Sequence, residues 1–215
     1  MIRMVMFDLD GTLYPYDHCN QVAERRLKEV ISVRWSVSVQ EAGSMLEISK
    51  REVKEQLGNV AASHNRILYM QRLCEMKGEN PLLTAMNFYE VYWNTMLEEM
   101  RLFPYVMPLF QLLKRRNIKI GILTDLTAHI QYRKIERLEI GSYIDYFTSS
   151  EEAGEDKPSE KIFHKMLIKT PFQPEEVLMV GDSQEQDING AVRQGMQAVF
   201  YDGQADMVKE VEMLL

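Results

Sequence analysis

Short apolar runs alternate with helical patterns through the second half of this chain, and this alternation limits the fold more than any other feature. From residue 105 onward, four runs have the length and composition of buried strands: KIGILT (119–124), DYFTSS (145–150), VLMVG (177–181) and AVFY (198–201). Together with an apolar run at 3–7, they predict an α/β fold with a doubly wound parallel sheet in a Rossmann-like core. Right-handed crossovers should join the strands.

The first predicted strand is separated from the others by a segment with a different pattern. Apolar residues recur there at three- and four-residue spacing in four stretches, which predict helices near 18–34, 39–56, 61–77 and 83–100. Gly58 and the run GENP are the clearest breaks between them. We therefore expect two domains: a core formed by residues 1–15 and 101–215, and an inserted helical domain formed by residues 16–100.

Composition and charge narrow the class of partner. Of the 215 residues, 46% are hydrophobic and 27% are charged, which is ordinary for a globular protein with a sizeable core. The formal net charge of −7 disfavours polyanionic partners, so we expect neither a nucleic acid polymer nor an acidic membrane surface. The negative net charge does not exclude a small anionic ligand that binds together with a metal ion.

Cysteine usage and the N-terminus indicate the compartment. The two cysteines, Cys19 and Cys74, have neither CxxC spacing nor another metal-ligand spacing, so we interpret them as thiols of a reducing compartment. The N-terminal apolar run ends at Asp8, which makes it too short for a secretion signal or a membrane span. We therefore expect a cytoplasmic protein.

The first strand runs directly into two acids. In MVMFDLDGTLYP (4–15), Asp8 and Asp10 follow the apolar run with one residue between them. Ligands of open α/β sheets bind at the carboxyl ends of the strands. Two like charges held this close favour a cation or a proton between them. A DxD motif after a strand can also simply cap a turn, so the pair alone leaves both interpretations open.

Two further polar motifs follow predicted strands. GILTD (121–125) ends on Thr124 and Asp125, and a threonine hydroxyl at that place can bond a phosphoryl oxygen. EDKPSEKIF (155–163) places Lys157 before a proline that stiffens the loop, and a helix should begin near Ser159. The alternatives are ordinary ones, because threonine is common at helix N-termini and a lysine is normally a solvated surface charge.

The last motif, VLMVGDSQEQDINGA (177–191), places Asp182 and Asp187 after a buried strand and a glycine. Magnesium prefers carboxylate oxygens, so Asp182 is a candidate metal ligand. Asp187 suits a supporting position that holds a metal-bound water or Lys157. The helix dipole also favours an acid in the first turn of a helix, and for Asp187 both explanations can hold.

In order and approximate spacing, the four motifs resemble those of the haloacid dehalogenase-like hydrolase superfamily. DLDGT (8–12) looks like the nucleophile motif of that superfamily, and the resemblance covers residues 3–15 and about 100–203. The place of the helical insertion resembles the subfamily whose helical cap follows the first motif. Many members have Asn and Gly after the threonine, whereas this chain has Asp125 and Leu126, which leaves the hydroxyl in place but the subfamily open.

The resemblance implies a phosphoryl-transfer site that uses magnesium. Asp8 would be the nucleophile that attacks phosphorus and forms an aspartyl phosphate. Asp10 would protonate the departing oxygen and later accept a proton from water. The Mg²⁺ ion would be held by the carboxylate of Asp8, the backbone carbonyl of Asp10 and the carboxylate of Asp182.

The same resemblance implies a set of groups for the phosphoryl oxygens. Thr124, Lys157 and backbone N–H groups near Gly11 and Asp125 would bind these oxygens while charge spreads over them. Lys157 would also hold the nucleophile in its ionised form.

The sequence therefore predicts a magnesium-dependent phosphatase of a small phosphorylated metabolite. Alternatives are a phosphosugar mutase of the same fold and a non-catalytic protein that binds a phospho-ligand. Dehalogenases of this fold generally lack the second acid, so Asp10 favours phosphoryl chemistry. The helical insertion should cover the site and choose the substrate, and four of its arginines are candidates for substrate contact: Arg25, Arg26, Arg66 and Arg72. No feature of the sequence fixes an oligomeric state.

Overall fold

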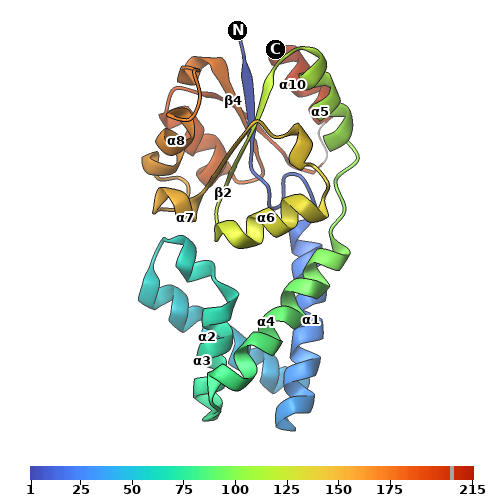
Figure 1. The fold of residues 1–215 in the computed structure, drawn as a ribbon, viewed down its shortest axis with the longest axis vertical. Helices are drawn as coiled ribbons and strands as arrows, with labels where there is room; N and C mark the ends of the chain where they lie inside the picture. The colour runs from blue at the N-terminus through green and yellow to red at the C-terminus, as the bar shows by residue number, and fades with distance from the viewer. Residues whose placement is uncertain (204–205) are drawn as a thin grey trace. The chain divides into compact units, whose positions relative to one another are not determined.

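The computed structural model describes residues 1–203 and 206–215, and the chain forms two compact units (Figure 1). One unit comprises Met1–Pro15 and Arg101–Leu215 and contains the sheet. The other comprises Tyr16–Met100 and contains only helices among its elements. No helix in the described residues is long and apolar enough to cross a membrane.

The sheet of the first unit has five parallel strands in the order β3-β2-β1-β4-β5. Their bounds are Met4–Phe7 (β1), Lys119–Thr124 (β2), Tyr146–Ser149 (β3), Val177–Gly181 (β4) and Gln197–Phe200 (β5). The predicted α/β class with a parallel sheet is confirmed. The first strand in the chain is the central strand, so the strand order reverses beside it, which is where ligands bind in such sheets.

Helices cover both faces of this sheet. Alternate residues of β1 point to opposite faces. Met4 and Met6 pack in a buried cluster with residues of α8 (Glu160–Leu167), whereas the ring of Phe7 lies 5.2 Å from that of Phe110 in α5 (Val106–Arg115). Figure 1 shows these two helices on opposite sides of the strands. Because both faces are covered, all four residues of β1 are buried.

The remaining elements of this unit are short. They are α6 (Ala128–Arg137), η2 (Gly141–Tyr143), α7 (Ser150–Ala153), η3 (Pro174–Glu176), the π-helical turn η4 (Gln184–Asn189), α9 (Gly190–Arg193) and α10 (Met207–Leu214). Of these, α6 follows β2 and η4 follows β4, so both begin near the carboxyl edge of the sheet.

The second unit contains four helices and one short 3₁₀ turn. Their bounds are Tyr16–Trp35 (α1), Val39–Leu57 (α2), Ala61–His64 (η1), Arg66–Lys77 (α3) and Pro81–Glu99 (α4). The prediction of one helix over 61–77 is wrong, because Asn65 interrupts it. The side chain of Asn65 accepts a hydrogen bond from the N–H of Ile67 and so caps the start of α3.

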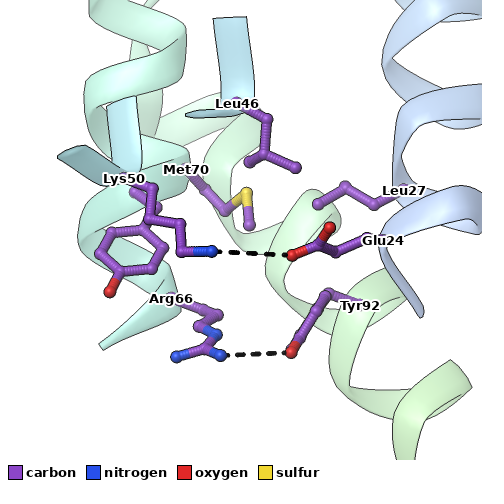
Figure 2. A pocket seen from close by; sticks show the side chains of 8 residues that line it. Glu24, Leu27, Leu46, Lys50, Arg66, Met70 and Tyr92 are labelled. Carbon is purple, nitrogen blue, oxygen red and sulfur yellow. Dashed lines mark hydrogen bonds and ion pairs between the residues drawn. The ribbon is translucent and has the colours of Figure 1, made fainter. Parts of the chain in front are cut away.

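The interior of the helical unit contains a buried cation (Figure 2). Arg66 donates to the carbonyl of His64 and to the hydroxyls of Tyr16 and Tyr92, and its guanidinium lies over aromatic rings, including that of Trp93. It lines a small pocket with Glu24, Leu27, Leu46, Lys50, Tyr69, Met70 and Tyr92. Within this unit Arg66 therefore joins α1, α3 and α4.

The other arginines proposed as substrate contacts lie nearer the surface of this unit. Arg26 pairs with Glu29, and Arg72 pairs with Glu52, with half-exposed side chains in both pairs. Arg25 is exposed on α1. Both cysteines, Cys19 and Cys74, are free and buried.

Candidate active site

The loop after β1 brings the first motif against the last. Asp8 is 5% exposed, and its N–H donates to the carbonyl of Val180, which continues the pairing of β1 with β4. The hydroxyl of Thr12 lies 3.4 Å from Asp8 Oδ2 and 3.3 Å from Asp182 Oδ1. Two of the predicted acids therefore share one hydroxyl neighbour.

Gly11 is what allows this close approach. Its φ of 91° lies in the region that favours glycine, and a methyl group at this position would overlap the carboxylate of Asp182. The backbone of the DLDGT loop can thus turn directly beside Asp182.

Lys157 connects three of the predicted site residues. Its ammonium lies 2.5 Å from Asp8 Oδ1 and 2.7 Å from Asp187 Oδ1, and its backbone N–H donates to Asp125 Oδ1 at 2.8 Å. Burial alone would lower the pKa of Lys157, but the carboxylates of Asp187 and Asp8 outweigh it and raise this pKa well above its ordinary value. The lysine therefore stays charged between two acids.

Asp8, Asp182 and Asp187 form an acidic cluster in which one carboxylate oxygen of each lies within 4.8 Å of the others. Burial raises the pKa of Asp8 well above its ordinary value; Lys157 opposes this effect, and Asp187 is foremost among the acids that add to it. Burial and Asp187 also raise the pKa of Asp182. A hard divalent cation bound to these oxygens would relieve the repulsion, so the donor set suits Mg²⁺.

Thr124 is the last residue of β2, and Asp125 follows it and contacts the backbone of Lys157. Thr124 is buried, and its Oγ1 lies 2.6 Å from Gln131 Nε2 on α6. Burial raises the pKa of Asp125, against the influence of Lys157. The Asp125 side chain acts on the backbone of Lys157, whereas the sequence suggested only a role for the Asp125 N–H.

Leu126 occupies the position where the family pattern favours glycine. Its φ is 93°, which is uncommon for a residue with a branched side chain. Its N–H donates to Ser150 Oγ at 3.0 Å, and its side chain is buried, so hydrogen bonding and packing hold this conformation. The departure from the family pattern therefore places a leucine in a backbone conformation that glycine adopts more readily.

Asp10 is bound by two residues of α6 that the sequence did not suggest. Lys134 Nζ lies 2.7 Å from Asp10 Oδ1 and 2.6 Å from Oδ2, Gln131 Nε2 lies 3.3 Å from Oδ2, and the hydroxyl of Tyr14 donates to Oδ1. Burial would raise the pKa of Asp10, but the charge of Lys134 and these hydrogen bonds lower it overall.

One signal in the sequence was available for Lys134. Ile130, Lys134 and Leu138 are spaced four residues apart, so the lysine lies on the buried stripe of α6 rather than on its solvated face. A cation on such a stripe needs a buried acid as partner.

Comparison with known proteins identifies the family. The model of the family described as haloacid dehalogenase-like hydrolase matches residues 5–201. The chain belongs to this family.

The relatives of this family member include named phosphatases. It is 36% identical over 204 residues to a ribulose-1,5-bisphosphate 5-phosphatase of Halopiger xanaduensis, with 94% of this chain and 85% of the relative covered. It is 31% identical over 204 residues to a glyceraldehyde 3-phosphate phosphatase of Methanopyrus kandleri, with coverages of 93% and 83%. The predictions of the family and of a phosphatase are thus confirmed: the chain is a phosphoric monoester hydrolase of the haloacid dehalogenase-like type.

Solved structures show the same fold. A 2-haloacid dehalogenase of Pseudomonas syringae has a TM-score of 0.78 at 23% identity, with 96% of this chain and 89% of that chain covered. A phosphatase of the family from Thermococcus onnurineus has a TM-score of 0.70 at 23% identity, with coverages of 95% and 88%. At this identity the likeness concerns the fold alone.

Proposed function

We propose that this chain hydrolyses small phosphorylated metabolites, with phosphorylated sugars as the favoured class, through an aspartyl phosphate on Asp8 and with the help of Mg²⁺. The observation that carries this proposal is the buried carboxylate of Asp8 at the end of the central strand, which contacts the ammonium of Lys157 and clusters with the acids Asp182 and Asp187. The names of the relatives support the substrate class, since they act on ribulose bisphosphate and glyceraldehyde 3-phosphate.

In the first step, Asp8 attacks phosphorus and the bond from phosphorus to the departing oxygen breaks. Lys157 favours the ionised form of the attacking carboxylate against the effect of burial, and it orients this carboxylate through its contact with Oδ1. Asp10 in its protonated form gives its proton to the departing oxygen, so the product leaves as an alcohol; this proton is the one that Asp10 took up from water in the second step of the preceding turnover. Lys157, Thr124 and backbone N–H groups near Gly11 and Asp125 bind the equatorial oxygens as charge spreads over them.

In the second step, water attacks the phosphorus of the aspartyl phosphate, and Asp10 takes up the proton that this water loses. Asp8 is released as a carboxylate together with inorganic phosphate. The carboxylates of Asp8 and Asp182 and the backbone carbonyl of Asp10 would hold the metal ion, while Asp187 orients Lys157. Bound Mg²⁺ would cancel the repulsion between the phosphate dianion and these acids.

The helical unit Tyr16–Met100 is proposed to act as the cap that selects the substrate. This role is supported by its place in the chain, directly after the motif that contains Asp8 and Asp10. We also propose that the enzyme acts in the cytoplasm.

The test is release of inorganic phosphate from a panel of phosphorylated sugars, nucleoside monophosphates and 4-nitrophenyl phosphate, with Mg²⁺ or with a chelator. We expect release that needs Mg²⁺ and that Asp8→Asn abolishes. The matched control is Asp206→Asn, since Asp206 is exposed at the start of α10 and asparagine caps a helix as well as aspartate does. Phosphate release that survives in Asp8→Asn contradicts the proposed nucleophile.

A further inference from the structure

Helix α6 presents two buried polar side chains to the loop that follows β1. Gln131 and Lys134 are three residues apart, so they lie on the same face of the helix, and both are fully buried. A fully buried lysine is uncommon, because its charge loses the hydration that water provides. The partner that makes this burial tolerable is the carboxylate of Asp10.

Four hydrogen bonds hold that carboxylate. Lys134 Nζ contacts both oxygens, at 2.7 and 2.6 Å, the hydroxyl of Tyr14 donates to Oδ1, and Gln131 Nε2 lies 3.3 Å from Oδ2. Tyr14 is also fully buried. A carboxylate with donors on both oxygens has little freedom to rotate, so the position of Asp10 is set by its neighbours rather than by its own rotamer preference.

Gln131 connects this group to the carboxyl end of β2. Its Nε2 lies 2.6 Å from the carbonyl oxygen of Asp125 and 2.6 Å from Thr124 Oγ1. Because a carbonyl and a carboxylate can only accept, these partners fix which end of the amide is the donor. Its Oε1 is buried and has no hydrogen-bond partner in residues 1–203 and 206–215, which the structure describes. The amide nitrogen thus donates its hydrogen bonds to residues of the site.

From this geometry we propose that Lys134, assisted by Gln131, is a positioning residue for proton transfer by Asp10. It holds the carboxylate beside Thr124 and Asp125, where the ionised form can accept a proton from the attacking water and the protonated form can serve the departing oxygen. Lys134 exchanges no proton itself: in the first step the proton moves from Asp10 to the departing oxygen, and in the second step from water to Asp10. The inference rests on the proposed function and adds a residue to it.

Lys134→Met separates this role from a structural one through the choice of leaving group. An alkyl phosphate needs protonation of its departing oxygen, whereas 4-nitrophenolate leaves without it. For an alkyl phosphate such as glycerol 1-phosphate, we expect kcat to fall about 100-fold or more, because loss of a general acid costs at least about that factor. KM should change little. For 4-nitrophenyl phosphate, we expect a rapid burst of about one nitrophenolate per enzyme and then slow turnover, because the second step still needs Asp10.

A double-mutant cycle with Asp10→Asn provides the second readout. If Lys134 acts through Asp10, the double variant loses no more activity than Asp10→Asn alone. The matched control is Lys165→Met on α8, whose exposed pairing with Glu152 lies outside the site, and it should turn over like the wild type. Lys134→Gln keeps one donor and should show the same burst with a smaller loss.

Either of two outcomes overturns the inference while the proposed function stands. One is a Lys134→Met enzyme that is folded by circular dichroism and shows no burst, and the other is a double variant whose losses multiply. Should Lys134→Met fail to fold, Lys134→Gln decides by the same burst criterion. Turnover by Asp8→Asn, in contrast, rejects the proposed function itself.

Discussion

Gly11 is the residue at which backbone conformation and site chemistry depend on each other most directly. Replacing it by alanine should destabilise the protein by about 1–3 kcal/mol, because the new methyl group would occupy a left-handed conformation and overlap Asp182. Displacing Asp182 should also weaken Mg²⁺ binding, so that a higher Mg²⁺ concentration is needed for half-maximal phosphate release. Urea unfolding and a magnesium titration of the activity measure the two effects.

Gly154→Ala is the matched control for Gly11→Ala. Gly154 has a φ of 86°, but no atom would lie within 4 Å of an added methyl group. It should therefore lose only about 1 kcal/mol from the backbone conformation and keep its response to Mg²⁺. Equal effects of the two substitutions on that response would contradict the proposed contact with Asp182.

The residues of the site differ in how visible they are in the sequence. Asp8, Asp182 and Asp187 follow strands closely, and Lys157 lies in the loop after β3 and α7. Because parallel strands bring their carboxyl ends to one edge, the positions of the motifs, together with their resemblance to the superfamily, predicted that these side chains gather. Lys134 lies within a helix, where a lysine usually means a solvated face. Its burial depends on a partner more than 120 residues away in the chain, and single-residue patterns do not report such pairings.

At the scale of elements, Arg66 should stabilise the helical unit far more than Arg72, although both belong to α3. Arg66→Met removes donors to two tyrosine hydroxyls and a carbonyl inside the unit, with an expected loss of about 2–3 kcal/mol. Arg72→Met removes a half-exposed ion pair with Glu52, which contributes little because solvent screens it. Both tryptophans lie in this unit, so tryptophan fluorescence in urea measures the two losses. Similar losses would show that the interior contacts of Arg66 contribute no special stability.

Element boundaries were predictable where a pattern had sharp ends. The run VLMVG coincides with β4 because a proline and two acids precede it and a polar turn follows it. The helix expected over 61–77 was wrong because neither a glycine nor a proline marks the break at Asn65. A side-chain cap at Asn65 decides the start of α3, and a capping residue inside an apolar spacing is hard to distinguish from a helical one.

For the whole molecule, the sequence predicted the parallel, doubly wound class because strands and helices alternate. The order β3-β2-β1-β4-β5 needed the structure, since it depends on which strands pair, and β1 lies more than 100 residues from either neighbour in the chain. The central place of β1 explains why its loop can meet motifs from strands on both sides.

The acidic cluster at this meeting point should make the stability of the protein depend on Mg²⁺. Asp8, Asp182 and Asp187 come together only in the folded chain, so the ion binds the folded state and stabilises it by about 2.7 kcal/mol at a concentration 100 times its Kd. Differential scanning calorimetry with rising Mg²⁺ should show an increasing Tm. Asp182→Asn should remove most of this increase, whereas the exposed Asp206→Asn should retain it. A Tm that does not respond to Mg²⁺ in the wild type, or one that responds equally in Asp182→Asn, would contradict a metal site that uses the carboxylates of Asp8 and Asp182.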